Sequence, residues 1–223
     1  MRPIVGAGRS MDQATKSNDV EQTRIVLGLL EYVERGGEQS QRRLASELGV
    51  ALGLVNAYVR RCVRKGLVKV RHAPARRYAY YLTPRGFAEK SRLTVEYMSY
   101  SLSLFRRAKA ECTAAFAAAR ERGFARMALL GVSDLAEIAM ICALDSGMTI
   151  VAVIDPGTSA QRFAGAPVAA SPDDLNQPID AVLVTDMRAA GETAAAAIAR
   201  YGAERVFMPA LLGALPNLDR GAA

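Results

Sequence analysis

The stretch from Gln39 to Leu82 constrains the fold of this chain most, because it combines two short amphipathic helical patterns with the densest positive charge in the sequence. Between Gln41 and Arg77 there are ten lysines and arginines and a single acidic residue, Glu47. A solvated helix face rarely carries so one-sided a charge. The stretch is therefore expected to form a small helical unit with a cationic surface.

The spacing of apolar residues predicts a helix, a turn and a second helix. Leu44, Ala45 and Leu48 form one apolar stripe, and Gly49 stands where a left-handed residue ends a helix. The second helix runs from about Ala51 or Leu52 to Lys65 and stops at Gly66. Its expected buried side consists of Val55, Val59, Cys62 and Val63.

The opposite face of the second helix is small near its start, polar in its middle and cationic further on. It carries Gly53, Asn56, Ala57, Arg60 and Arg64. A helix that enters the major groove of DNA needs this order, because its first half must approach the bases closely while Asn and Arg bond base edges. The pattern predicts a recognition helix.

A cationic hairpin follows the second helix. The sequence predicts strands at Leu67 to Arg71 and Arg77 to Leu82 around a turn at 73–75, which together make a wing. Cations at its tip would meet phosphates or the minor groove. A basic helical bundle with a hairpin is the plainer alternative, but the agreement in order and spacing favours DNA binding. The predicted contact set is Arg42, Arg43, Gly53, Asn56, Ala57, Arg60, Arg61, Arg64, Arg71, His72, Arg76 and Arg77.

Two motifs carry a family resemblance. Gly66-Leu67-Val68 opens the wing, and Leu82-Thr83-Pro84-Arg85-Gly86 follows it. With the flanking segments, they resemble the winged-helix regulators of the EPS-associated branch of the MarR family. The resemblance covers about the first half of the chain and implies a transcriptional regulator of extracellular polysaccharide genes.

Length and charge indicate a division of the chain into parts. With 223 residues it suits two modest domains, and the net charge is +12 over residues 1–122 but −5 over residues 123–223. Only the N-terminal half is expected to meet a polyanion. We expect a flexible arm over 1–19, a winged helix-turn-helix domain over 20–83, a linker or dimerisation helix over 84–122, and a Rossmann-like domain over 125–215.

Several classes of site and location are disfavoured. Cys62, Cys112 and Cys142 are widely separated on apolar helical patterns, and His72 is the single histidine, so we expect reduced core cysteines and no metal site. We expect a cytoplasmic protein with no membrane contact, because the sequence has neither a bilayer-length apolar stretch nor a signal peptide.

The helical pattern after the wing continues from Pro84 to about Arg122. Apolar residues follow a 3-4 spacing at Val95, Met98, Leu102, Phe105, Cys112 and Phe116, with Tyr97, Tyr100 and Leu104 as a second flank. This helix either packs on the chain's own domains or forms the interface of a homodimer. We favour the homodimer, because helix-turn-helix proteins bind the two half-sites of a palindromic operator through two-fold symmetry.

Beyond Ala125, short apolar runs alternate with helical patterns, which is typical of a parallel sheet covered by helices. We expect an α/β multidomain protein: an N-terminal winged helix-turn-helix, a long connecting helix and a C-terminal Rossmann-like parallel sheet. The expected strands are 127–132, 148–154, 180–185 and 205–208, and the expected helices are 134–146 and 188–201.

The turn after the first of these strands has the position of a dinucleotide-binding loop. Gly131 keeps the first glycine of the fingerprint, while Ser133 and Ala136 replace the second and third. Asp155 stands where a carboxylate would bond ribose hydroxyls. The replaced glycines disfavour NAD, because a side chain there hinders approach to a pyrophosphate. Asp134 at the helix start favours a self-capped scaffold turn as the alternative to a ligand site.

The same half, with its Gly165-Ala166-Pro167-Val168 strand, resembles the Rossmann-type domains of PglD-like and CapD-like sugar-nucleotide enzymes and of Rex repressors. By this resemblance Gly131, Ser133, Asp134 and Asp155 line a nucleotide or nucleotide-sugar site. No cofactor is certain; the possible effectors are a nucleotide-sugar and NAD(H).

Catalysis is disfavoured, because the C-terminal half has no His, no Lys and one Tyr, Tyr201. The favoured hypothesis is a non-enzymatic, double-stranded-DNA-binding homodimer that senses a nucleotide-sugar. The alternatives are a Rex-like NAD(H)-sensing repressor, a sugar-nucleotide enzyme fused to a DNA-binding module, and a purely structural dimerisation domain.

Overall fold

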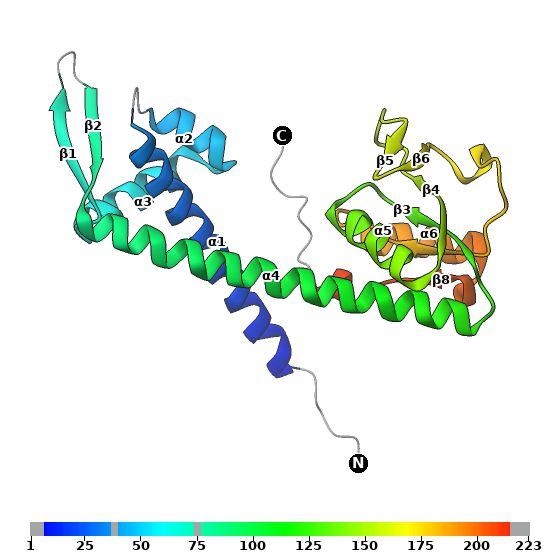
Figure 1. Ribbon diagram of the computed structural model, residues 1–223. Coiled ribbons are helices and arrows are strands. Elements are labelled where there is room, and N and C mark those ends of the chain that lie inside the picture. The colour runs from blue at the N-terminus through cyan, green and yellow to red at the C-terminus, as the bar shows by residue number, and fades with distance from the viewer. Residues whose placement is uncertain (1–6, 37–39, 74–76, 215–223) are drawn as a thin grey trace. The chain divides into compact units, whose positions relative to one another are not determined.

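The chain forms two compact units, residues 1–102 and 103–223, in a computed structural model that describes residues 7–36, 40–73 and 77–214 (Figure 1). One long helix, α4 (Pro84–Glu121), belongs partly to each unit. The N-terminal unit is helical with a two-stranded hairpin, and the C-terminal unit is an α/β sheet. The fold is therefore an α/β multidomain architecture with a winged helix-turn-helix at its N-terminal end.

The N-terminal unit contains three helices, the hairpin and the start of α4: α1 (Ala7–Arg35), α2 (Gln41–Leu48), α3 (Leu52–Arg64), β1 (Val68–Ala73) and β2 (Arg77–Leu82). Gly49 ends α2 in the left-handed conformation, with φ of 66°, so the chain turns sharply before α3. The strands β1 and β2 pair antiparallel, from Val68 opposite Leu82 to Ala73 opposite Arg77. The core of the unit centres on Leu29, Leu30, Val55, Cys62 and Val68.

The expectation of a flexible arm over 1–19 is wrong for residues 7–19, which belong to α1. This segment lacks an apolar period, but it contains Met11, Gln13, Ala14 and Lys16, which favour helix intrinsically. A helix whose later turns are buried at Ile25 and Leu29 can extend backwards through such residues. Apolar periodicity therefore located the later part of the helix and missed its first turns.

The C-terminal unit is built on a six-stranded sheet in the order β5-β6-β4-β3-β7-β8. Its elements beyond α4 are β3 (Arg126–Leu130), α5 (Asp134–Ser146), β4 (Thr149–Ile154), β5 (Arg162–Phe163), β6 (Ala166–Ala169), η1 (Pro172–Asp174), β7 (Ala181–Val184), α6 (Ala190–Tyr201), η2 (Ala203–Arg205), β8 (Val206–Phe207) and η3 (Ala210–Ala214). All pairs are parallel except β5 with β6. The short antiparallel edge hairpin, β5 with β6, departs from the purely parallel sheet that alternation predicts.

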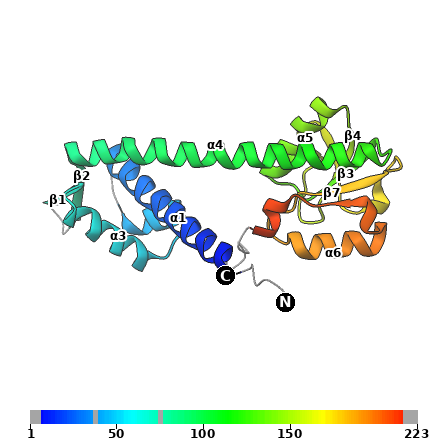
Figure 2. The ribbon, with the colours of Figure 1, turned by 90° about the horizontal axis from the view of Figure 1, so that it is seen from below.

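The five parallel strands have the chain order 3-2-1-4-5, which is the order of doubly wound sheets. Because crossovers from β3 to β4 and from β7 to β8 run in opposite directions, right-handed connections place α5 and α6 on opposite faces. Figure 2 shows α6 on the side of the strands away from α5. Successive strands are added to one side of β3 up to β6 and to its other side from β7, so the strand order reverses between β3 and β7.

The C-terminal half of α4 packs against this sheet beside α5. Cys112 and Phe116 are fully buried in the same cluster as Met127 and Cys142. The Cys142 thiol donates to the backbone oxygen of Lys109, and the Lys109 ammonium lies 3.3 Å from Asp145. The single stripe expected along α4 is therefore divided, since its second half belongs to this core.

The first half of that stripe stays exposed. Val95, Met98, Leu102 and Phe105 are 66, 59, 47 and 41% exposed. Four large apolar side chains on successive turns of one helix form a contiguous strip, defined here as the α4 strip. Within the described residues no helix is long and apolar enough to cross a membrane.

All three cysteines are buried and free of disulfides. Burial in apolar surroundings raises the pKa of Cys62 to about 11 and that of Cys112 to about 12. These two thiols are therefore protonated at neutral pH and act as small apolar core residues. No group of histidine, cysteine and acidic side chains suited to a metal ion occurs among the described residues.

Candidate nucleic-acid interface and ligand site

The exposed face of α3 carries most of the residues that the sequence assigns to DNA. Gly53, Ala57, Arg60, Arg61 and Arg64 are exposed, and Asn56 is half-buried. Since α3 has one buried side, these residues share the solvent side of the helix. The face keeps the expected order of small, then polar, then cationic side chains.

The buried side of α3 differs from the expected one at one position. Val63 is 36% exposed, whereas Tyr58 is 9% exposed and packs in the core with Val55, Val59 and Cys62. At 3.6 residues per turn, positions 58 and 63 lie on opposite flanks of the stripe formed by 55, 59 and 62, and the helix buries the Tyr58 flank. The expected buried side included Val63 and left out Tyr58.

The arginines of α3 have no acidic partner among the residues that the structure describes. On α2 the situation is different, because the Glu47 carboxylate accepts from Arg43 at 3.0 Å and from Arg35 at 3.4 Å. Arg43 is thus partly neutralised, while Arg42 is exposed without such a pair in the described part of the chain. The unpaired charge is therefore concentrated on α3 and at Arg42.

The wing adds exposed cations on one face of its hairpin. Lys69 and Arg71 are exposed on β1, and the Arg71 guanidinium lies 5.7 Å from the ring centroid of Tyr81. Tyr81 pairs with Lys69 across the hairpin. Of the other expected wing residues, Arg76 lies outside the described residues, as do the side chains of His72 and Arg77. Lys69 and Tyr81 were not in the expected contact set.

Hydrogen bonds fix the positions of the wing and α2 relative to the rest of the N-terminal unit. The Gln41 side chain donates to the Tyr80 hydroxyl at 2.9 Å. The buried Thr83 hydroxyl donates to the backbone oxygens of Gly66 and Leu67 and accepts from the Gly86 amide. Thr83 thereby caps α4 and fastens both ends of the hairpin to it. These hydrogen bonds therefore join the two sequence motifs, Gly66-Leu67-Val68 and Leu82-Thr83-Pro84-Arg85-Gly86.

The carboxyl ends of β3, β4 and β7 bring together the residues of the predicted ligand loop. The Gly131 backbone has φ of +104°, and a Cβ there would lie 2.7 Å from Asp186 Cα, so the β3 and β7 turns touch. The Ser133 hydroxyl donates to the Thr185 backbone oxygen at 2.6 Å and accepts from the Ala136 amide. This is the edge at which doubly wound sheets bind ligands.

Asp155 has a different environment from the one expected for a ribose contact. It is 5% exposed, its Oδ2 accepts from the Val132 amide at 2.8 Å, and its Oδ1 accepts from the Gly157 amide at 2.8 Å. The Arg188 guanidinium lies 4.0 Å away. A carboxylate of this protein therefore already occupies the loop amide that a phosphate would use.

Asp134 is exposed, and the N-cap of α5 is Ser133, so the expected capping by the Asp134 carboxylate is wrong. The neighbouring turn has its own acid, Asp186. Its carboxylate accepts from the amides of Arg188 and Ala189 and from the Thr193 hydroxyl. Burial raises the pKa of Asp186, but these bonds outweigh it and lower the pKa overall.

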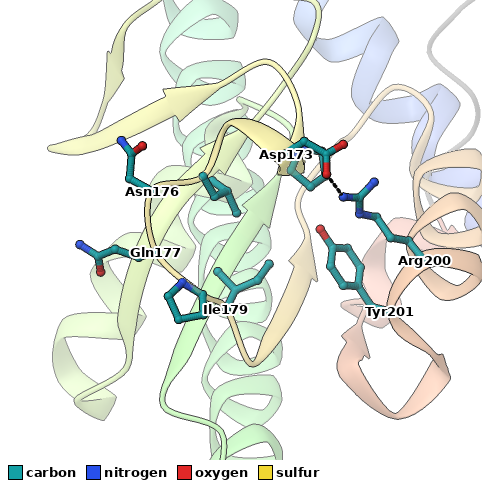
Figure 3. Close-up of a pocket in the computed structure, with 9 residues that line it drawn as sticks. Asp173, Asn176, Gln177, Ile179, Arg200 and Tyr201 are labelled. Carbon is teal, nitrogen blue, oxygen red and sulfur yellow. Dashed lines mark hydrogen bonds and ion pairs between the residues drawn. The ribbon is translucent and has the colours of Figure 1, made fainter.

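Sequence reasoning missed Thr185, Asp186 and Arg188 at this edge. The available signal was their position directly after the strand that adjoins β3, which only the strand order makes visible. It also missed an open groove of about 480 Å³ between the segment 172–179 and the end of α6, which is lined by Tyr201 and Arg200 (Figure 3).

Comparisons with known proteins match the N-terminal unit. Residues 22–69 match the family of winged helix-turn-helix DNA-binding domains. The crystal structure of a MarR family transcription regulator is 24% identical over 44% of this chain and 70% of its own, with a TM-score of 0.34. No curated protein matches the chain. Residues 22–69 of the N-terminal unit therefore have the winged helix-turn-helix fold.

Proposed function

We propose that the protein is a sequence-specific transcriptional regulator that binds double-stranded DNA as a homodimer. The observation that carries the proposal is the exposed face of α3, where Gly53 and Ala57 leave room for close approach and Arg60, Arg61 and Arg64 remain uncompensated by described carboxylates. Small residues and free guanidiniums at the same helix face suit base-edge contacts followed by phosphate contacts. The wing cations Lys69 and Arg71 contact the backbone beside the groove.

The homodimer forms through the α4 strip. Its residues are exposed large apolar side chains, and they recur at a spacing that two helices can share. A second copy of the chain supplies an identical strip, so a two-fold axis buries both strips at once. The resulting pair of α3 helices binds a palindromic operator.

The resemblance to EPS-associated MarR regulators supports extracellular polysaccharide genes as the target. The C-terminal unit senses an effector, and a nucleotide-sugar is the favoured class, with NAD(H) as the alternative. The support is the doubly wound strand order and the meeting of the β3, β4 and β7 turns at Gly131, Ser133 and Asp155. Since Asp155 holds the Val132 amide, the effector binds beside this carboxylate, where Asp134 and Arg188 are exposed, instead of through a bare glycine loop.

The test begins with DNA selection. The full chain is incubated with a random-sequence duplex library, bound fragments are sequenced, and a palindromic consensus with half-sites about one helical turn apart is expected. A pool that stays unenriched after repeated selection contradicts a sequence-specific regulator.

Effector sensing is tested on the selected operator. DNA affinity is measured by fluorescence anisotropy with UDP-, GDP- and dTDP-sugars and with NAD+ and NADH. A ligand can change DNA affinity only if it binds one arrangement of the dimer better than another. Asp134→Ala should weaken the response to the active ligand, because it removes an exposed carboxylate at the loop without touching the hydrogen bonds of Ser133 or Asp155. DNA affinity that no ligand of the panel changes contradicts the sensing role alone.

A further inference from the structure

The first turn of α3 is exposed and carries no polar side chain. Ala51, which is the N-cap residue, and the following Leu52, Gly53 and Leu54 are all exposed. Leu52 and Leu54 are 39 and 43% exposed, although both are large apolar side chains. Single exposed leucines are common on protein surfaces, but an unbroken exposed run without a polar side chain is not. This run is therefore expected to contact something other than water.

The same residues contribute little to the stability of the helix. Ala51 makes no side-chain hydrogen bond to the first amides of α3, where Ser, Thr, Asp or Asn would stabilise the helix. Gly53 does not have a positive φ, and a Cβ there would meet nothing within 4 Å, so alanine would fit. Alanine favours a helix more than glycine does. The small and apolar character of this turn is thus not explained by the needs of the free chain.

The charges on the rest of α3 indicate the kind of partner that covers this turn. Arg60, Arg61 and Arg64 follow on the same helix and are exposed. Glu47, the single acid between residues 41 and 77, forms its ion pairs with arginines of α1 and α2 instead. A second copy of the chain would bring the same cations and repel them, whereas the phosphates on both sides of a DNA groove neutralise them. Duplex DNA therefore suits the apolar turn and the arginines together.

One base-edge group in the major groove suits an apolar side chain. Recognition helices place their N-terminal residues against base edges. Guanine, adenine and cytosine show hydrogen-bond donors and acceptors there, while thymine adds a C5-methyl group to its acceptor. Leu54 offers no hydrogen bond, so it would leave the polar edges of the other bases without a partner. Contact with a thymine methyl group removes apolar surface from water on both sides.

Leu54 widens the DNA-contacting face that the sequence predicts. That face already contains Gly53, Ala57 and Arg60. Residues three or four positions apart are neighbours on a helix, so Leu54 adjoins Ala57, and both are exposed. Arg61 lies one turn further along the same side and is also exposed. The apolar patch of Leu54 and Ala57 therefore lies directly beside the arginines.

We propose that the first turn of α3 recognises thymine methyl groups, and that Leu54 with Ala57 makes this contact in each half-site. The inference rests on the proposed DNA-binding function and names the class of operator, whose half-sites contain a thymine next to the bases that Arg60 contacts. Leu54 is then a specificity residue. Its contact involves no phosphate, so it affects the choice of sequence and leaves the salt dependence of binding unchanged.

The test uses the full chain and the operator selected from the random-sequence library. Each thymine of the operator is replaced in turn by deoxyuridine, which pairs with adenine in the same way and lacks only the C5-methyl group. Affinity is measured by fluorescence anisotropy at several salt concentrations. We expect replacement of one particular thymine in each half-site to weaken binding about fourfold for each methyl group, the value for one buried methyl or methylene. The salt dependence should be equal for both operators.

Three variants connect this effect with the first turn of α3. Leu54→Ala should bind the thymine operator more weakly than wild type and should no longer distinguish thymine from deoxyuridine. Arg60→Ala should bind more weakly as well but should keep that distinction. Leu144→Ala is the matched control, because Leu144 is 83% exposed in the C-terminal unit, and it should leave both affinities unchanged. Thermal unfolding checks that Leu54→Ala is folded, as expected for an exposed helical position where alanine is favourable.

Two results overturn the inference and leave the proposed regulator intact. One is a selected operator on which every deoxyuridine replacement binds as the thymine operator does. The other is a Leu54→Ala variant that is as sensitive to deoxyuridine as wild type; if its mass in ultracentrifugation also changes, the turn forms a protein contact instead. A library in which no sequence is enriched overturns the DNA-binding proposal and this inference together.

Discussion

The carboxylate of Asp155 accepts a 2.8 Å hydrogen bond from the backbone amide of Val132, which joins the end of β4 to the turn after β3. In glycine-rich nucleotide loops the corresponding amides face a pyrophosphate. Here the chain supplies its own anion, so the turn is satisfied without a ligand. The serine and alanine that replace the later glycines fit this arrangement, because nothing has to approach the backbone there.

Asp155→Ala should destabilise the C-terminal unit by about 3 kcal/mol, since two amides lose a charged acceptor and each such bond contributes about 1.5 to 3 kcal/mol before relaxation. Urea unfolding followed by circular dichroism measures the change. Asp134→Ala removes an exposed carboxylate from the same turn and should cost less than about 1 kcal/mol. Equal effects of the two substitutions would show that the Asp155 contacts contribute little.

Gly86→Ala should destabilise the N-terminal unit by about 2 to 3 kcal/mol. A Cβ at this position would overlap the Leu67 backbone oxygen, which also accepts from the Thr83 amide and hydroxyl and so has little freedom to move. Gly191→Ala is the matched control within a helix, because a Cβ there meets nothing within 4 Å, and it should be neutral or stabilising. Hydrogen exchange of peptides from each unit separates the two effects. Full protection of the Gly86→Ala hairpin would contradict the steric argument.

The Gly86 contact also shows which parts of the structure a sequence can reveal. Motifs with their own local physics were predictable: the Gly49 turn, the α3 face, the presence of the hairpin and the α5 bounds all follow from spacing, capping and turn residues. The spacing of residues along the sequence does not reveal which residues from distant segments lie in contact after folding. That Leu67 lies against Gly86, and Val132 against Asp155, depends on strand order and on loops that meet after folding.

The same reason explains what was missed. Thr185 and Asp186 are recognisable as site residues only from the structure, because β7 lies beside β3 although 50 residues separate the two strands in sequence. Tyr201 ends an alanine-rich helix that gives no sign of a groove. The division of the α4 pattern at Phe105 likewise depends on where the sheet begins to cover the helix, which is a property of tertiary packing.

Asp180 should make the stability of the C-terminal unit sensitive to acid. Hydrogen bonds from the amides of Ala125 and Arg126 lower the pKa of its carboxyl group in the folded state. A depressed folded pKa gives stability that is complete above the unfolded pKa of about 3.9 and is lost as the pH falls through the lower folded value. Asp180→Asn should be less stable than wild type by about 1 to 2 kcal/mol at pH 7, with a difference that shrinks below pH of about 4. Urea unfolding at a series of pH values measures it, and a difference independent of pH would contradict this role.

Arg60→Ala and Arg71→Ala should weaken DNA binding in different ways. Arg60 lies on the α3 face, so its loss should cost about 1 to 3 kcal/mol on the selected operator and much less on scrambled duplex. Arg71 lies on the wing, so its loss should weaken all duplexes nearly alike and reduce the salt dependence by about one phosphate contact. Anisotropy titrations at several salt concentrations measure both. If the two variants behave identically, α3 is not the recognition helix.

Leu102→Asp should prevent the proposed homodimer and leave a folded monomer. Leu102 lies in the middle of the α4 strip and is 47% exposed, so a carboxylate there is tolerated by the single chain but would be buried against its counterpart in a dimer. Analytical ultracentrifugation gives the mass, and anisotropy on full and half operators gives the consequence for DNA. The monomer should retain half-site binding and lose the extra affinity that two linked half-sites provide. Ser101→Asp, exposed on the same turn but outside the strip, should stay dimeric. A Leu102→Asp protein that sediments as a dimer would place the interface elsewhere on the chain.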